Sequence, residues 1–106
     1  MEERTRHFIK NIPVYSRFRG ILLEYTGLVK LKEQARWTKI YSKHLEQRIR
    51  EEIGRTKLVY SASVKEEDII EGFKKLVELA MRDSWYKTRL TSMEILYRNF
   101  GRLIQK

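Results

Sequence analysis

Apolar residues recur every three or four positions along much of the chain, which is the period of one face of an α-helix. The first such pattern covers residues 13–26, where Pro13 suits an opening turn and Gly27 suits the position after the last turn. Its apolar face consists of Val14, Phe18, Leu22 and Tyr25. The second pattern covers residues 30–53, and we expect Gly54 to end it. Its apolar face consists of Trp37, Ile40 with Tyr41, Leu45, Ile49 and Ile53.

Two later segments carry the sequence of a capping box, in which a Ser or Thr and a Glu three positions on satisfy free N–H groups at a helix start. The first is Ser63-Val64-Lys65-Glu66 and the second is Thr91-Ser92-Met93-Glu94. The apolar stripe after the first box consists of Ile69, Ile70, Phe73, Leu76, Val77 and Ala80. The stripe after the second box consists of Met93, Leu96, Tyr97, Phe100, Leu103 and Ile104. Both stripes predict amphipathic helices.

These four patterns predict an all-α fold, a compact bundle of four to five helices. Residues 1–10 either add a short helix or remain a flexible arm. No repeat, low-complexity tract or linker interrupts the sequence, so we expect a single domain over residues 1–106. The predicted core consists of Phe18, Leu22, Tyr41, Leu45, Phe73, Leu76, Val77, Leu96, Phe100 and Leu103.

The 106 residues include no cysteine, which excludes a disulfide scaffold and a zinc site built on thiolates. A chain of this length forms one domain with a modest core. Its apolar runs, such as residues 21–23, are far shorter than the roughly 20 residues of a membrane helix. The first residues lack the apolar centre of a signal peptide. We therefore expect a soluble cytoplasmic protein with no membrane partner.

Charge narrows the function classes further. The formal net charge is +9, and its distribution is uneven. Residues 1–60 carry fourteen basic and seven acidic groups, residues 61–81 carry three and five, and residues 82–106 carry six and two. Such an excess is typical of proteins that bind a polyanion such as nucleic acid. The alternative is the dense surface charge of heat-adapted proteins, which explains many charges of both signs but not nine unbalanced positive ones.

The second predicted helix carries a stripe of cations. It consists of Lys32, Arg36, Lys39 and Lys43, whose spacings of four, three and four positions align them on one helix face. Successive cations are then about 5–6 Å apart along the helix, comparable to the spacing of phosphates along one strand of DNA. The acidic residues of this segment fall elsewhere around the helix. We expect the stripe to contact DNA phosphates, and the alternative is an ordinary solvated face.

The connection between the third and fourth predicted helices, residues 82–89, interleaves two aromatic side chains with three cations. Aromatic rings stack on unpaired bases while Lys and Arg hold phosphates, which suits single strands. We expect a second DNA-contacting surface formed by Tyr86, Lys87, Arg89, Arg98 and Arg102. Trp85 either stacks on a base or braces the connection against the core. We favour bracing for Trp85, with Tyr86 as the exposed ring.

Few residues are suited to catalysis. The histidines are His7, near the start of the chain, and His44, beside the apolar face of the second predicted helix. The acidic residues 66–68 with Glu71 could hold Mg²⁺ through oxygens, but acids in a first helical turn also offset the helix dipole. No glycine-rich phosphate loop is present. We therefore expect no enzyme activity, no metal and no required cofactor.

The final part of the chain resembles a known family. An acidic residue precedes a Trp-containing element at Asp83–Trp85, a Thr-Ser helix start follows, and the last helix has the form Leu96…Asn99-Phe100…Ile104. The upstream Glu67-Asp68-Ile69-Ile70…Phe73 fits the helix before it. In these features residues 66–105 resemble the C-terminal helical domain of bacteriophage and plasmid replication proteins, which are initiators or primase-associated proteins. Residues 1–60 have no counterpart in this resemblance, and no helicase or polymerase motif accompanies it.

The resemblance implies a DNA-binding helical module of a mobile-element replication or primase apparatus. Its partners would be DNA, single-stranded or template, and other replication proteins. One alternative is a nucleotide-binding accessory bundle of a primase-polymerase, in which residues 82–89 and Arg98 grip ATP or another nucleotide. The other is a protein-interaction module that recruits a helicase or polymerase through Trp37 and Trp85.

Overall fold

The computed structural model describes residues 13–105, so the arm predicted at residues 1–10 lies outside the described part. The described residues form α2 (Val14–Thr26), α3 (Ala35–Lys57), the 3-10 turn η1 (Ser61–Ser63), α4 (Glu66–Arg82), α5 (Ser84–Arg89), α6 (Met93–Arg98) and α7 (Phe100–Ile104). No strand occurs between residues 13 and 105. The predicted all-α fold is confirmed.

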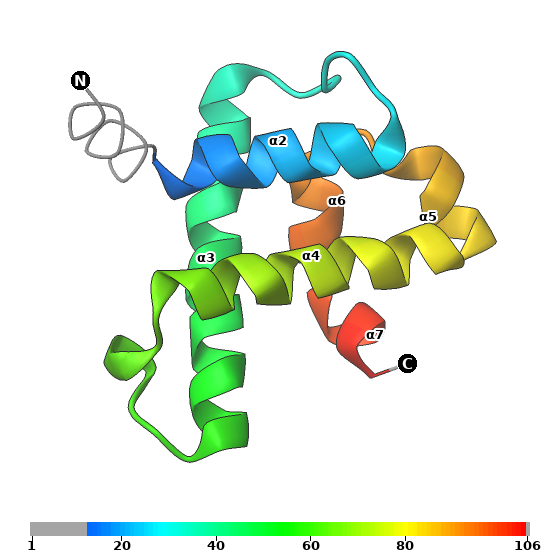
Figure 1. The fold of residues 1–106 in the computed structure, drawn as a ribbon. Helices are drawn as coiled ribbons and strands as arrows, with labels where there is room; N and C mark the ends of the chain where they lie inside the picture. Colours follow the sequence, from blue (N-terminus) through cyan, green and yellow to red (C-terminus); the bar gives the residue numbers. More distant parts are fainter. Residues whose placement is uncertain (1–12, 106) are drawn as a thin grey trace, which may run out of the picture.

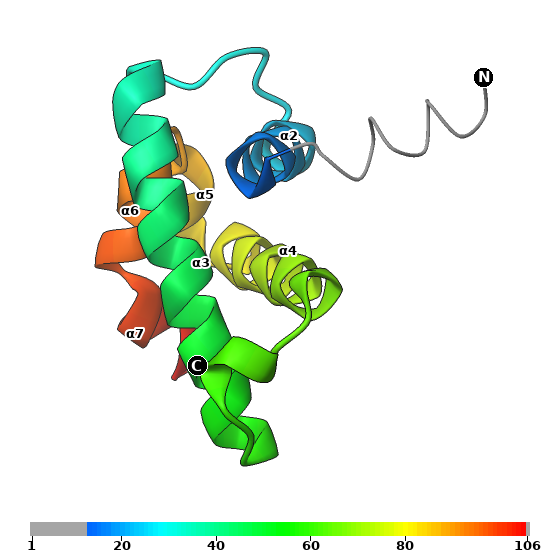
Figure 2. The same ribbon diagram turned by 90° about the vertical axis from the view of Figure 1, so that its left-hand side faces the viewer.

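The longest helix, α3, contacts α2, α4 and α6 (Figure 1). The helices α2 and α4 lie side by side and cross α3 steeply. Behind α2 and α4 in the view of Figure 1, α6 packs on α3 and α7 packs on α4. The short helix α5 forms the corner that leads from α4 toward α6 (Figure 2). No helix of the described part has the length and apolarity needed to cross a membrane.

The core lies where α2, α3, α4 and α6 meet. Phe18 of α2 stacks on Phe73 of α4 with ring centroids 4.0 Å apart and planes inclined by 4°. Nine of the ten predicted core residues are buried. The tenth, Tyr41, is half-buried, and its hydroxyl donates a hydrogen bond to Glu94 Oε1 at 3.0 Å. A hydrogen bond from Tyr25 to Glu78 Oε1 (3.0 Å) joins α2 to α4 at the surface and raises the pKa of the Tyr25 hydroxyl.

Both ends of α3 differ from the prediction. The helix begins at Ala35, five residues later than expected, because residues 30–34 are held in an irregular path. Leu31 is buried in the core, and the Lys32 N–H donates to the Thr91 carbonyl at 3.1 Å. Tertiary contacts therefore replace the first predicted turn of this helix.

Gly54 does not end α3, so that prediction is wrong. The helix continues to Lys57, and Leu58 then takes a left-handed conformation with φ 57°. The chain turns back across Gly54, where a Cβ would lie 3.0 Å from the Val59 carbonyl oxygen and 3.2 Å from the Ser61 Cα. The glycine is needed for this close approach.

The first predicted capping box is also wrong. Ser63 lies in η1, and its N–H donates to the Tyr60 carbonyl at 2.9 Å. Arg50 holds this turn by donating to the Val64 carbonyl at 3.0 Å. The helix α4 therefore starts at Glu66, with Lys65 at its N-cap and no side-chain cap.

The second capping box is replaced by a long-range cap. Ser92 is the N-cap of α6, and its hydroxyl accepts from the Ile95 N–H at 3.4 Å. The free N–H groups of Met93 and Glu94 donate to the two carboxylate oxygens of Glu33 at 3.0 and 3.1 Å. A carboxylate sixty residues away thus satisfies two N–H groups of the first turn, in place of the reciprocal local pair of Thr91 and Glu94.

Two further short helices appear because of local side-chain caps. Residues 84–89, expected as a connection, form α5, since Asp83 Oδ1 accepts from the Trp85 N–H at 2.8 Å and the Tyr86 N–H at 3.4 Å. The last predicted helix is divided at Asn99 into α6 and α7. The Asn99 amide donates to the Ile95 carbonyl at 2.8 Å and accepts from the Tyr86 hydroxyl at 3.0 Å.

Candidate nucleic-acid interface

Ion pairs are distributed unevenly over the surface. Six occur among residues 13–105, and they join Arg17–Glu66, Arg50–Glu46, Arg55–Glu52, Lys57–Asp68, Lys74–Glu71 and Arg98–Glu94. Residues 18–45 contribute to none of these pairs. The cations of residues 18–45 therefore have no carboxylate partner within the described part of the chain.

Residues 18–45 contain six cations, which are Arg19, Lys30, Lys32, Arg36, Lys39 and Lys43, and all six are exposed. The acids of the segment are Glu24 and Glu33. Both oxygens of Glu33 are engaged at the start of α6. Glu24 lies on the side of α2 away from Arg19 by helical spacing. The segment thus presents a local positive excess.

Three of the four stripe residues occupy α3 as expected. Arg36, Lys39 and Lys43 lie on one side of the helix by their spacing. Lys32 does not, because α3 begins only at Ala35, and Lys32 belongs to the irregular segment before it. The prediction that Lys32 lies on this helix face is wrong.

The fold adds α2 and the segment after it to this surface. The Lys39 Nζ lies 5.4 Å from the ring centroid of Tyr15 on α2. Tyr15 also lines a cavity of about 170 Å³ together with Arg19 and Lys30. We define the α2–α3 basic face as Arg19, Lys30, Arg36, Lys39 and Lys43. Sequence reasoning missed Arg19 and Lys30, and the sequence carries no periodic signal that joins them to the stripe.

Arg50, in the second half of α3, does not belong to the α2–α3 basic face. Its guanidinium pairs with Glu46 at 3.4 Å and donates to the carbonyls of Ser61 and Val64 at 3.5 and 3.0 Å. The residue therefore holds η1 against α3 instead of extending the stripe. The basic face is confined to the first half of α3, where α2 crosses it (Figure 2).

Trp37, predicted on the apolar face of α3, is 42% exposed. The Arg36 guanidinium carbon lies 5.2 Å from its ring centroid, and the Tyr41 ring is tilted beside it at 6.1 Å. A cavity of about 500 Å³ opens in front of the indole. The late start of α3 explains the exposure, because no preceding helical turn covers Trp37.

The assignments of Trp85 and Tyr86 are reversed. Tyr86 is 5% exposed and Trp85 is 50% exposed. Because Asp83 starts a helix here, neighbouring side chains point about 100° apart and only one of them faces the core. Tyr86 packs inward, and Trp85 lies outward with the Arg89 guanidinium carbon 4.6 Å from its ring centroid. Tyr86 is therefore not an exposed DNA-contacting ring.

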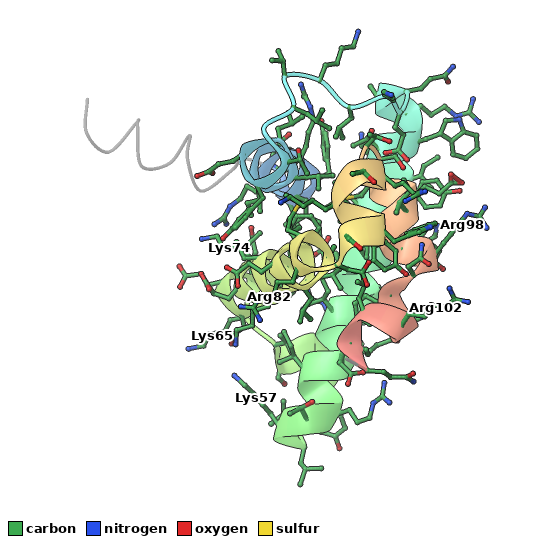
Figure 3. The ribbon with its side chains drawn as sticks, turned by 90° about the vertical axis from the view of Figure 1, so that its right-hand side faces the viewer. Lys57, Lys65, Lys74, Arg82, Arg98 and Arg102 are labelled. Carbon is green, nitrogen blue, oxygen red and sulfur yellow. The ribbon has the colours of Figure 1, made fainter. Side chains whose placement is uncertain are left out.

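The remaining predicted residues lie on α5, α6 and α7, and none of them lines the cavity that Tyr15 shares with Arg19 and Lys30. Arg102 lines a cavity of about 290 Å³ with Asp83, Trp85 and Tyr86. Lys87 and Arg89 are exposed on α5. Figure 3 shows Arg98 and Arg102 pointing outward on one side of the molecule, away from Lys65, Lys74 and Arg82.

Arg98 is already engaged. Its Nε donates to Glu94 Oε1 at 3.1 Å, and this hydrogen bond raises the pKa of the guanidinium. Neutralised by a carboxylate, Arg98 is a weaker phosphate ligand than Lys87, Arg89 or Arg102, which form no ion pair with any described residue.

The candidate metal-binding residues do not form a metal site within residues 13–105. His44 is exposed, and its ring stacks on Tyr97 with centroids 5.3 Å apart. Among the described residues no three His, Cys, Asp or Glu side chains converge on a metal position. His7 lies outside the described residues. The expectation that the chain is not an enzyme stays a prediction.

The reversal of Trp85 and Tyr86 has a measurable consequence. Tyr86→Ala is expected to lower the free energy of unfolding by on the order of 3 kcal/mol, since a buried ring is removed. Trp85→Ala, which shortens a half-exposed side chain, is expected to cost less than about 1 kcal/mol. Urea denaturation of the two single variants tests this order, and equal losses would mean that both rings are packed in the core.

Comparisons of the chain with protein-family models, with curated proteins and with solved structures found no match. The resemblance of residues 66–105 to replication proteins therefore stays a prediction.

Proposed function

We propose that the protein binds DNA, single-stranded or template, as a helical module of a mobile-element replication apparatus. The α2–α3 basic face is the main phosphate-binding surface. The observation that carries this proposal is the absence of any carboxylate partner for its five cations within the described residues. Phosphates are the groups that such a surface recognises.

The contrast with α4 argues against an ordinary solvated face. The outer side of α4 also carries cations, but it mixes them with acids, and Lys74 pairs with Glu71 at 3.4 Å. Grouped like charges repel one another, so an unpaired cluster lowers stability unless a counter-charge covers it. Cations and acids are therefore mixed on the outer side of α4, whereas cations are in excess on the α2–α3 basic face.

Binding through this face is expected to depend little on sequence. Its cations are Lys and Arg side chains suited to phosphate, and no helix of the described part presents the Asn, Gln and Arg pattern of a groove-reading recognition helix. Neutralising five phosphates of a single strand gives a slope of log K against log[salt] of about −3.5. Affinity is then expected to fall about a hundredfold between 50 and 200 mM salt.

A second contact surface is proposed at α5 and α7. It consists of Arg89 and Arg102 beside the exposed ring of Trp85, together with the exposed Lys87 of the same helix α5. The Trp85 ring takes the stacking role that the sequence had given to Tyr86. A nucleotide-binding role for the same region depended on Arg98, whose pairing with Glu94 makes that alternative weaker.

One observation favours the protein-interaction alternative. The turn after α3 exposes Leu58 and Tyr60 almost fully, at 91% and 86%. An apolar turn of this kind can dock against a partner protein. Association through it would depend little on salt, because no counterions are released from DNA.

An NMR titration of backbone amides separates these functions. Single-stranded DNA is expected to shift the amides of residues 15–19, 30–43 and 84–89, and the shifts should weaken as salt is added. Saturable shifts with ATP alone, confined to residues 82–98, would favour the nucleotide-binding function. No shift with single-stranded or duplex DNA at low salt would contradict the proposed function.

A further inference from the structure

The cavity in front of Trp37 joins three separate parts of the chain. It is formed by the segment before α3, the first two turns of α3 and the first turn of α6. Its lining consists of Lys32, Glu33, Gln34, Trp37, Tyr41 and Glu94. The volume of about 500 Å³ falls in the range of about 300–1,000 Å³ that is usual for small-molecule sites. The α2–α3 basic face adjoins this cavity through Arg36, which lies over the Trp37 ring.

The exposed indole gives the cavity an aromatic wall. Trp37 is 42% exposed, and the planar Arg36 guanidinium already lies against its ring. Aromatic side chains and Arg planes are the surfaces on which unpaired bases stack in single-strand-binding proteins. Lys32, at the edge of the same cavity, is exposed and suited to the phosphate of a base bound there.

A fixed carboxylate lines the same cavity. Glu94 Oε1 accepts hydrogen bonds from the Tyr41 hydroxyl at 3.0 Å and from Arg98 Nε at 3.1 Å. Glu94 Oε2 accepts none from any residue between 13 and 105. The carboxylate is thus held in place by two donors, and its second oxygen keeps its capacity to accept a hydrogen bond. Its neighbour Glu33 is fixed by the N–H groups of Met93 and Glu94.

Ionised carboxylates accept hydrogen bonds and cannot donate them. They therefore favour bases with an exocyclic amino group, such as the N4 amino group of cytosine. Uracil and thymine present a carbonyl oxygen at the same position, which a carboxylate repels. The lining of this cavity is consequently selective among bases, unlike the basic face beside it.

We infer that the Trp37 cavity binds one unstacked base that carries an exocyclic amino group, with the base stacked on Trp37 and its amino group donating to Glu94. This inference rests on the proposed function, because the base belongs to a strand whose phosphates lie on the α2–α3 basic face. Among pyrimidines the cavity selects cytosine over uracil.

The test compares short oligo(dC) and oligo(dU), which differ at this position by an amino group against a carbonyl. Oligo(dC) is expected to bind about fivefold more tightly at neutral pH. Glu94→Gln should reduce this preference below about twofold, because an amide can donate as well as accept. Glu78→Gln is the matched control, since Glu78 also accepts from a tyrosine hydroxyl at 3.0 Å but lies on α4, and it should keep the preference.

Fluorescence locates the base. The chain has two tryptophans, so Trp85→Phe leaves Trp37 as the sole indole. Oligo(dC) is expected to quench its emission strongly, and Trp37→Ala should weaken binding roughly 5- to 150-fold by removing the stacking surface. Tyr60→Ala, which removes an exposed ring elsewhere, should leave affinity unchanged.

Two outcomes separate this inference from the proposed function. Salt-dependent binding with equal affinity for oligo(dC) and oligo(dU), and without quenching of Trp37, would overturn the base-binding cavity while leaving the basic face in place. Failure of both oligonucleotides to bind at low salt would overturn both.

Discussion

Replacing Phe73 with Ala is expected to lower the free energy of unfolding by about 3–5 kcal/mol. The Phe73 ring is fully buried and lies parallel to Phe18 at 4.0 Å, so its removal leaves a cavity between α4 and α2. Small domains are stable by only about 5–15 kcal/mol. The variant should therefore unfold at much lower urea concentration and lose part of its folded population.

The control for this variant is Tyr60→Ala. Tyr60 is also aromatic but is 86% exposed, so its removal should change the free energy of unfolding by less than about 0.5 kcal/mol. Urea titrations of both variants with the same probe give the comparison. A decrease below about 1 kcal/mol for Phe73→Ala would mean that α2 does not pack on α4 as described.

The sequence predicts the core well because its apolar period is clear. All six residues of the α4 stripe are buried, and this helix also has the cleanest separation of apolar and charged positions. The helical spacing of these residues and the packing of the whole fold favour the same buried side. Periodicity was therefore sufficient to predict the inward side of α4. In the first half of α3 it was not, because Thr38 and Ser42 are buried there while the predicted Trp37 is 42% exposed.

The ends of α2 were predicted correctly, since it ends at Thr26 before a left-handed Gly27. Other helix ends could not be predicted in the same way, because long-range contacts determine them. Glu33 caps α6 from sixty residues away, and the Thr91 carbonyl holds Lys32 outside α3. A glycine at position 54 is typical of a helix end, but here it lets the backbone of Val59 and Ser61 approach α3 closely. None of these contacts has a local signature, so capping rules gave the wrong residue in each case.

In the candidate site, too, local spacing predicted some residues, and long-range contacts determine the others. Arg36, Lys39 and Lys43 share a face because helical spacing alone places them there. Arg19 and Lys30 join them only through the crossing of α2 over α3. Trp85 and Tyr86 were interchanged because α5 was not predicted, and the direction of each ring depends on the position where Asp83 starts that helix.

Removal of two cations from the α2–α3 basic face should weaken DNA binding and make the affinity less dependent on salt concentration. Each single-strand phosphate that the protein no longer neutralises makes the slope of log K against log[salt] shallower by about 0.7. Lys39→Ala with Lys43→Ala should therefore reduce the slope by about 1.4, and affinity should fall similarly for all sequences. Stability should change little, because both side chains are exposed and form no ion pair with a described residue.

Lys74→Ala with Lys75→Ala is the matched control. It removes the same charge from α4, where Lys74 is labelled in Figure 3 and pairs with Glu71. Because these residues lie outside the α2–α3 basic face, the control should bind with the slope of the unmodified protein.

Salt titrations of single-stranded DNA binding by these two double variants show whether the α2–α3 basic face binds phosphate. Phosphate binding by the α2–α3 basic face predicts a slope that is shallower by about 1.4 for the Lys39 and Lys43 variant and unchanged for the Lys74 and Lys75 variant. Identical slopes for the two double variants would contradict the account, because the basic face would then be a solvated surface that contacts no phosphate.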